Sequence, residues 1–94
     1  MIAVLVRVHI VIKGRVQGVL YRWSTVRRAR SSGIKGWIRN LPNGQVEALI
    51  EGEETDVKKL LDWMKVGPER AVVERVEIDW QPYVGELSDF RIIK

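Results

Sequence analysis

Apolar residues along this chain repeat with two different periods, and the order of those periods limits the folds available to it. Residues 5–13 alternate with the two-residue period of a strand that buries one face. Residues 22–32 carry apolar side chains three apart and are followed by Gly33, which indicates a helix and its end. Residues 57–64 show the clearest helical stripe, because Val57 is followed by apolar residues at i+3, i+4 and i+7. Two helices therefore interrupt a series of strands.

Strand-like segments fill most of the remaining sequence. Residues 34–40 and 45–51 are joined through Asn43-Gly44, whose preference for positive backbone dihedrals is typical of a tight hairpin turn. Alternation returns at 75–80, and a short strand is expected at 90–93. For the segment 45–51 we expect inward side chains at Val46, Ala48 and Ile50, outward ones at Glu47 and Glu51, and an end at Gly52.

The resulting order is strand, helix, strand, strand, helix, strand, with a short strand at the C-terminus. This is the order of the ferredoxin-like α/β sandwich, a βαββαβ fold of the α+β class. We therefore expect an antiparallel sheet with two helices on one face, in a single domain over residues 1–94. Trp23 and Trp80 are expected in its core, and Trp37 and Trp63 as partly exposed packing residues. Because such sandwiches host many functions, function has to be inferred from a site.

Composition limits where the protein acts and what it binds. The absence of cysteine excludes a disulfide framework, a thiol nucleophile and a thiolate metal site, and it favours a reducing cytoplasm. The apolar start at residues 1–6 is too short for a membrane span and lacks a small-residue cleavage site. A net charge of +4 attracts small anions or nucleic acid weakly. Charged residues make up 30% of the chain and asparagine and glutamine are few, so we expect a thermostable protein.

The segment from Gly14 to Arg22, GRVQGVLYR, joins the first strand to the first helix and is suited to binding an anion. Gly14 and Gly18 allow left-handed or close-approach backbone conformations, in which successive N–H groups turn toward one centre. The helix N-terminus adds unpaired N–H groups and a partial positive charge, and Arg22 adds a planar two-pronged donor. Three sources of positive potential therefore meet where phosphate oxygens would sit.

A second segment, GWIRNLPNG from Gly36 to Gly44, carries Asn40 on the inward face at the end of its strand. In an antiparallel sheet this position can lie on the side where the first helix begins. Asparagine is no base at neutral pH, but its amide can orient a water for in-line attack. Arg39 alternates to the other face and is expected to be a surface charge. Together the two segments predict a phosphate site with a water-positioning amide.

Neither segment supplies a metal ligand or a general acid. The loop has no Lys-Ser/Thr pair, both segments lack carboxylates, and the single histidine, His9, points to the opposite face of its strand as a solvated residue. An alkyl phosphate leaves as an alkoxide and needs such help, whereas an acyl phosphate leaves as a carboxylate of pKa about 4. We therefore expect a metal-independent reaction of mixed anhydrides, without a cofactor.

The chain resembles the acylphosphatase family, in order and over nearly its whole length, in GRVQGVLYR, GWIRN, the NG turn followed by VEALIEG, GPERA and the closing FRI. The resemblance implies hydrolysis of acyl phosphates to a carboxylate and inorganic phosphate by a small monomeric cytoplasmic enzyme without a cofactor. By position it implies that Arg22 binds the phosphate and that Asn40 orients the water. It also implies a phosphate-binding loop made of Arg15, Val16, Gln17, Gly18, Val19, Leu20 and Tyr21, completed by Arg22.

Three positions depart from the usual family pattern. Tyr21 stands where phenylalanine usually precedes the arginine, and its hydroxyl needs a partner if it is buried. The turn is Asn-Gly where Asp-Gly is common, and the first helix ends in Ser-Gly where Leu-Gly is usual. None of these changes removes a proposed catalytic group, so they bear on stability and rate.

Two other functions occur on sandwiches of this kind. The open face of the sheet can stack RNA bases, but here the outward positions of the first and third strands hold no aromatic residue and several carboxylates, so nucleic-acid binding is disfavoured. Those positions are Arg7, His9, Val11, Lys13, Gln45, Glu47, Leu49 and Glu51. A regulatory anion-binding domain is the other alternative, because acylphosphatase-like modules also occur within larger proteins. The initiating methionine and the lack of a linker favour an independent enzyme whose partners are small acyl phosphates and inorganic phosphate.

Overall fold

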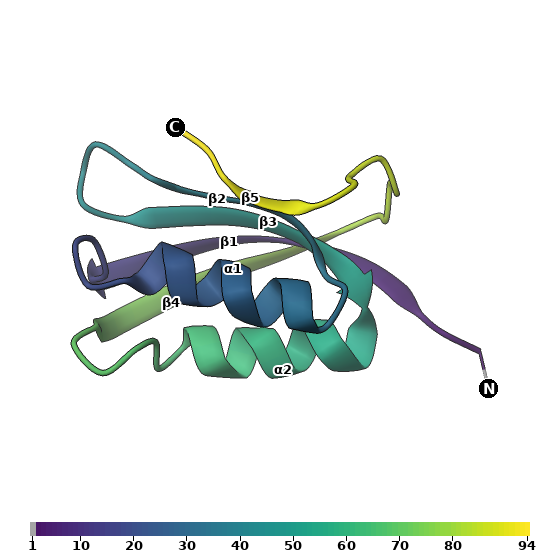
Figure 1. Cartoon of the computed structure of the whole chain (residues 1–94), viewed down its shortest axis with the longest axis horizontal. Helices are drawn as coiled ribbons and strands as arrows, with labels where there is room; N and C mark the ends of the chain where they lie inside the picture. Colours follow the sequence, from purple (N-terminus) through teal and green to yellow (C-terminus); the bar gives the residue numbers. More distant parts are fainter. Residues whose placement is uncertain (1) are drawn as a thin grey trace.

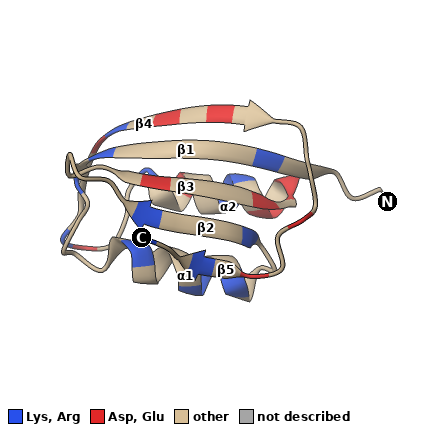
Figure 2. Cartoon of the chain, turned by 90° about the horizontal axis from the view of Figure 1, so that it is seen from above, with Lys and Arg blue, Asp and Glu red and all other residues tan. Residues whose placement is uncertain are grey.

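Five strands and two helices form a two-layer sandwich in the computed structural model, which describes residues 2–94. All strands belong to one sheet of order β4-β1-β3-β2-β5, and both helices cover the same face of it (Figures 1 and 2). The expected ferredoxin-like α+β sandwich is thereby confirmed. The elements in chain order are β1 (Leu5–Arg15), α1 (Tyr21–Ser31), β2 (Lys35–Asn40), β3 (Val46–Glu53), α2 (Glu54–Met64), β4 (Val72–Gln81) and β5 (Phe90–Ile92).

The last strand makes the sheet mixed, whereas the sequence predicted a wholly antiparallel one. β1 lies antiparallel to β3 and β4, and β2 antiparallel to β3, but β5 pairs with β2 in parallel. The reason is the connection over residues 82–89, which leads from β4 at one edge of the sheet to β5 at the other (Figure 2). β4 ends at the end of the sheet where β2 begins, so β5 starts there and runs in the same direction.

Three strands run further than expected, and one of them is β4, which begins at Val72 instead of residue 75 and ends at Gln81. β1 continues to Arg15 through a register shift against β4 between Lys13 and Gly14. β3 continues past Gly52 to Glu53, because Gly52 still pairs with Val6 of β1. The longer β1 carries the chain to the end of the sheet before the turn into α1, which fixes where the loop between them begins.

Apolar side chains on the helix-facing side of the sheet form the core. α2 buries the whole expected stripe of Val57, Leu60, Leu61 and Met64. On β2 both Gly36 and Ile38 are buried, so Asn40, two residues further, faces the same helix-covered side. No helix within residues 2–94 is both long and apolar enough to cross a lipid bilayer.

The expectation for two of the four tryptophans is wrong. Trp23 is 53% exposed and Trp80 is 48% exposed. Trp80 lies on edge strand β4, whereas the helices pack mainly over the other four strands. Trp23 lies in the first turn of α1, where it lines a groove on the protein surface and is not packed in the core. Trp37 and Trp63 are half-buried, as expected.

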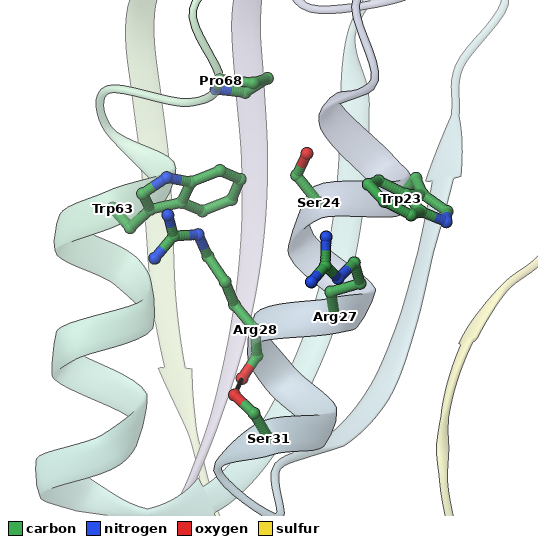
Figure 3. A pocket seen from close by; sticks show the side chains of 7 residues that line it. All are labelled: Trp23, Ser24, Arg27, Arg28, Ser31, Trp63 and Pro68. Carbon is green, nitrogen blue, oxygen red and sulfur yellow. Dashed lines mark hydrogen bonds between the residues drawn. The ribbon is translucent and has the colours of Figure 1, made fainter.

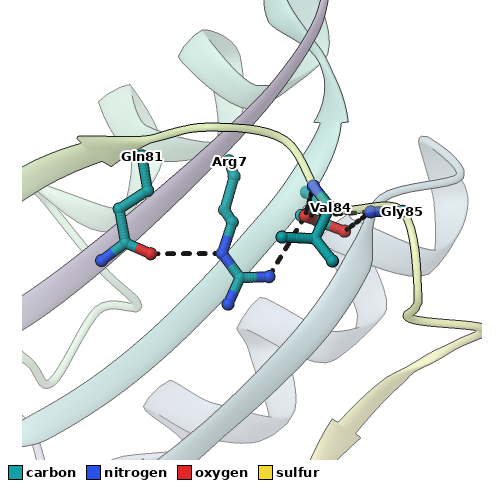
Figure 4. Close-up of polar contacts among 5 residues, drawn as sticks. Arg7, Gln81, Val84 and Gly85 are labelled. Atoms are coloured by element: carbon teal, nitrogen blue, oxygen red, sulfur yellow. Dashed lines mark hydrogen bonds and ion pairs between the residues drawn. The ribbon is translucent and has the colours of Figure 1, made fainter.

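Glu51 was expected to point outward, and it does leave the helix side, yet only 2% of it is exposed. Its carboxylate accepts a hydrogen bond from Arg7 Nη1 at 3.2 Å and from the backbone N–H groups of Val84 and Gly85 at 2.9 and 3.2 Å (Figure 4). Arg7 Nε also donates to Gln81 Oε1 at 3.2 Å. This buried, fully hydrogen-bonded carboxylate fixes the β4–β5 connection against the end of β3.

Replacing Gly14 by alanine should lower the free energy of unfolding by about 3 kcal/mol or more. Gly14 has φ +131°, and an added Cβ would lie 2.1 Å from the Val72 carbonyl oxygen, so β1 and β4 would have to separate. Denaturant-induced unfolding measures the loss. Gly33→Ala is the matched control, because Gly33 also has positive φ but nothing within 4 Å of the added carbon, and it should cost only about 1 kcal/mol. Equal losses in both variants would contradict the prediction.

Candidate active site

The loop between β1 and α1 lies at one end of the sandwich and contains backbone strain (Figure 1). Gly18 has φ +72° and Leu20 has φ +64°, in the left-handed region that side chains with a Cβ adopt only at a cost. Leu20 is the one non-glycine residue with positive φ among residues 2–94. Strain of this kind persists where the surrounding structure enforces it, commonly at a ligand site.

The loop is shorter than the phosphate-binding segment that the sequence predicted. Arg15 is the last residue of β1 and Tyr21 the first of α1, which leaves residues 16–20 between them. The Val16 side chain is buried in the core, whereas Gly18 and Leu20 are exposed. The exposed part of this loop is therefore the main chain at Gly18 together with Leu20, which is 69% exposed.

α1 begins without a cap from any side chain, and its first turn holds no acidic residue. The backbone N–H groups of a first helical turn have no partner within the helix, and the helix dipole places partial positive charge beside them. Most helices satisfy these groups with a Ser, Thr, Asp or Asn at the N-cap, but here the N-cap is Leu20. The start of α1 is thus left suited to an anion.

Tyr21 anchors the start of α1 in the core. Its side chain is 1% exposed and its hydroxyl donates a 2.7 Å hydrogen bond to the Met64 carbonyl oxygen at the end of α2. Burial raises the pKa of the Tyr21 hydroxyl, so it remains a donor at any working pH. The partner that this hydroxyl was expected to need is therefore present.

Tyr21→Phe should lower the free energy of unfolding by about 1–2 kcal/mol, because the buried Met64 carbonyl loses its donor. Thermal and denaturant unfolding measure this change. Tyr83→Phe is the matched control, since Tyr83 is 44% exposed, and its unfolding free energy should change by less than about 0.5 kcal/mol. If the Tyr21 variant were as stable as the control, the hydrogen bond would contribute nothing measurable to the free energy of unfolding.

Gln17 ties the loop to the β2–β3 hairpin. Its Nε2 donates to the carbonyl oxygens of Leu41 and Gln45, each at 2.8 Å. Leu41 directly follows Asn40, so these two bonds fix the loop relative to the end of β2. No sequence signal could have revealed this role, because both acceptors are backbone groups that any residue type supplies.

Arg22 borders a hollow of about 270 Å³ next to the loop. Its side chain is half-buried, yet within residues 2–94 its guanidinium takes part in no ion pair. The positive charge is therefore available to a ligand in the hollow. The other residues lining it are Val16, Gly18, Leu20, Tyr21, Trp23 and Ile92.

Asn40 ends β2 with its side-chain oxygen buried and without a hydrogen-bond partner among residues 2–94. A buried polar atom without a partner costs free energy, so its presence in a native structure is explained by a bound water or ion, by strain, or by a catalytic role. An amide oxygen in this state can accept a hydrogen bond from a water molecule.

The register of β2 and β5 places Asn40 beside the hollow of Arg22. Ile92, which lines that hollow, pairs with Ile38 of β2. Asn40 follows Ile38 by two residues on the same face, which is about 6.6 Å along a strand. The loop, Arg22 and Asn40 thus come to the same end of the molecule, the first two around one hollow and the third next to it.

The open face of the sheet carries a separate ionic cluster around Glu47. His9 Nε2 lies 2.8 Å and Arg39 Nε 2.5 Å from the Glu47 carboxylate. Burial alone would raise the pKa of Glu47, but the hydrogen bonds and charges of His9 and Arg39 hold it below its ordinary value. Arg39, expected to be a surface charge, and His9, expected to be a solvated strand residue, both remain partly exposed and pair with this carboxylate. The open face also holds Trp37, which β2 places beside Leu49.

Comparison with known proteins assigns the chain to a family. The acylphosphatase family model matches residues 8–92. The chain is 51% identical over 89 residues to an acylphosphatase of Pyrobaculum islandicum, and the match covers 94% of each protein. It is 47% identical over 87 residues to an acylphosphatase of Syntrophus aciditrophicus, and that match covers 93% of this chain and 91% of the other protein. A crystal structure of acylphosphatase from Bacillus subtilis superposes with a TM-score of 0.91 at 27% identity, covering 97% of this chain and all of the other. The chain belongs to the acylphosphatase family, whose members are hydrolases of acid anhydrides.

Proposed function

We propose that this protein hydrolyses the carboxyl–phosphate bond of acyl phosphates by holding the phosphoryl group and positioning a water, without a metal or other cofactor. The observation that most favours this is the buried Asn40 oxygen without a partner, beside a hollow that has an unpaired guanidinium. In this reaction the main-chain N–H groups of residues 16–20 and the start of α1 bind the phosphoryl oxygens. Arg22 adds two parallel hydrogen bonds and its charge.

Asn40 then orients the attacking water in line with the bond that breaks. The water oxygen bonds to phosphorus while the bond between phosphorus and the acyl oxygen breaks, and the electron pair leaves with the carboxylate. The water's proton passes to a phosphoryl oxygen of the substrate. No residue lining the hollow has a carboxylate or an imidazole, which suits a carboxylate leaving group of pKa about 4 that needs no acid.

The sharpest test compares benzoyl phosphate with p-nitrophenyl phosphate, each with and without a chelator. We expect rapid hydrolysis of benzoyl phosphate that the chelator leaves unchanged, and slow or no hydrolysis of the ester, because its leaving group is far more basic. Inorganic phosphate should inhibit competitively. Equal rates for both substrates, or a rate lost with the chelator and restored by a divalent cation, would overturn the mechanism.

We also propose that the protein is a monomeric, cytoplasmic and thermostable domain over residues 1–94 that binds no nucleic acid. Its charged content and the rarity of asparagine and glutamine support thermostability. Calorimetry should show a Tm above about 60 °C, and light scattering should give the mass of one chain. The ionic cluster around Glu47 supports the absence of nucleic-acid binding, and tight, salt-sensitive RNA affinity would refute it.

A further inference from the structure

A groove of about 340 Å³ runs between α1 and α2 on the outer surface of the helix layer (Figure 3). It is separate from the hollow of Arg22 but shares one residue with it, Trp23. Trp63 comes from α2 and Pro68 from the connection between α2 and β4. The residues that line it are Trp23, Ser24, Arg27, Arg28, Ser31, Trp63 and Pro68.

Each tryptophan of the groove has an arginine stacked on it. Arg27 Cζ lies 4.9 Å from the ring centroid of Trp23, and Arg28 Cζ lies 4.4 Å from that of Trp63 (Figure 3). A guanidinium held over a ring keeps its N–H groups free at the edge of its plane. The stacking thus fixes the two arginines without using the donors with which they could bind an anion.

The groove is electropositive. Within residues 2–94 neither Arg27 nor Arg28 forms an ion pair, and no residue lining the groove is acidic. α1 holds four arginines and no acidic residue, and its arginines are visible as blue bands in Figure 2. Trp23 is 53% exposed, so part of its ring surface is open to a ligand.

One end of the groove lies at the α2–β4 connection, away from the β2–β3 turn that adjoins Asn40. In Figure 1 the loop between β1 and α1 has the β2–β3 turn on one side and the α2–β4 connection on the other. Asn40 adjoins that turn, and Pro68 of the groove belongs to that connection. In an in-line displacement the leaving group departs opposite to the attacking water. A water at Asn40 therefore directs the acyl group away from the β2–β3 turn, and Trp23, which lines both the hollow and the groove, connects the two.

We propose that this groove binds the acyl group of the substrate and favours planar, aromatic acyl groups that have a second negative charge. Trp23 provides the stacking surface next to the phosphoryl group, and Arg27 provides the charge. Arg22 and Arg27 are five residues apart on α1, about 7.5 Å along the helix axis, and Trp23, which lines both the hollow and the groove, comes between them in the sequence. The inference rests on the proposed function and adds the substrate class to it.

The test compares 4-carboxybenzoyl phosphate with benzoyl phosphate, a pair that differs by one negative charge at the far end of the ring. In the unaltered protein kcat/KM should be higher for the carboxylated substrate. Arg27→Gln should lower that ratio about fivefold, mainly through KM, because the groove contacts a part of the substrate that does not react. Gln suits an exposed helical position, so folding should be preserved.

Arg75→Gln is the matched control, because it removes the same charge from the open face of β4. Its ratio should equal that of the unaltered protein. An unchanged ratio in Arg27→Gln, or an equal drop in Arg75→Gln, would overturn the proposal, the second by showing general electrostatic attraction.

Trp23→Leu provides a second readout through the ratio of benzoyl phosphate to acetyl phosphate. Losing the stacking surface should lower that ratio about threefold to tenfold, and an unchanged ratio would rule out Trp23 as part of the acyl site. Failure of the groove is distinguishable from failure of the proposed function. In the first case the protein still hydrolyses acetyl and benzoyl phosphate, and in the second it hydrolyses neither.

Discussion

Arg22→Ala should reduce kcat/KM for benzoyl phosphate at least ~10²-fold. In other enzymes, removal of a single hydrogen-bond donor that stabilises the transition state causes a loss of this size. Charge on the phosphoryl oxygens develops next to a half-buried guanidinium that no carboxylate neutralises among residues 2–94. Affinity for inorganic phosphate should fall as well, because the ground state uses the same charge. Steady-state kinetics and phosphate inhibition constants measure both effects.

Two variants separate the role of the guanidinium from that of positive charge alone. Arg22→Lys keeps the charge but loses the planar fork, so it should recover phosphate binding better than it recovers turnover. Arg75→Ala removes a charge on the opposite side of the sheet and should leave both constants unchanged. The assigned role would be untenable if Arg22→Ala retained more than half of the original kcat/KM and its phosphate affinity.

The order and type of the elements followed from hydrophobic periodicity because one face of each element is buried. The stripe on α2 is the clearest case, since each of its four apolar residues is buried in the structure. Periodicity could not predict that β5 pairs in parallel, because that depends on the path of residues 82–89. It also failed for Trp80, since alternation identifies a face of a strand but not whether a helix covers that face.

The candidate site was predictable in its chemistry and less so in its geometry. Glycines, an arginine at a helix start and an asparagine at a strand end are residue types with local meaning, so the sequence indicated an anion site. The left-handed φ of Leu20 and the two bonds from Gln17 depend on tertiary contacts. The exposure of Trp23 was not predicted, because a tryptophan at helical spacing is usually a core residue.

Strain at Leu20 and the partnerless oxygen of Asn40 are costs to folding in the same small region. Each is of the order of 1–3 kcal/mol. The buried core, the Tyr21 hydrogen bond and the Glu51 contacts offset these costs elsewhere in the sandwich. A region that lowers stability while holding donors and acceptors in fixed positions is expected at a site selected for binding and catalysis.

Asn40→Ala should abolish most turnover of benzoyl phosphate while leaving inorganic phosphate binding nearly unchanged. The amide contacts only the attacking water in the proposed reaction, so kcat should fall at least ~10²-fold, comparable with the loss of a positioning group, and the phosphate inhibition constant should change by less than about threefold. The variant should be no less stable than the parent, and up to about 1 kcal/mol more stable, because it removes a buried oxygen that has no partner.

Asn40→Asp tests the same role from the opposite direction. A carboxylate at this position keeps an acceptor for the water but places negative charge beside the phosphoryl group, so it should weaken phosphate binding where alanine does not. Phosphate binding should therefore be weakened in Asn40→Asp and unchanged in Asn40→Ala. This combination is expected only for a residue that faces the phosphoryl group without binding it. An alanine variant with near-normal kcat would eliminate the water-positioning role, and a large loss of phosphate affinity in it would instead place Asn40 among the phosphate ligands.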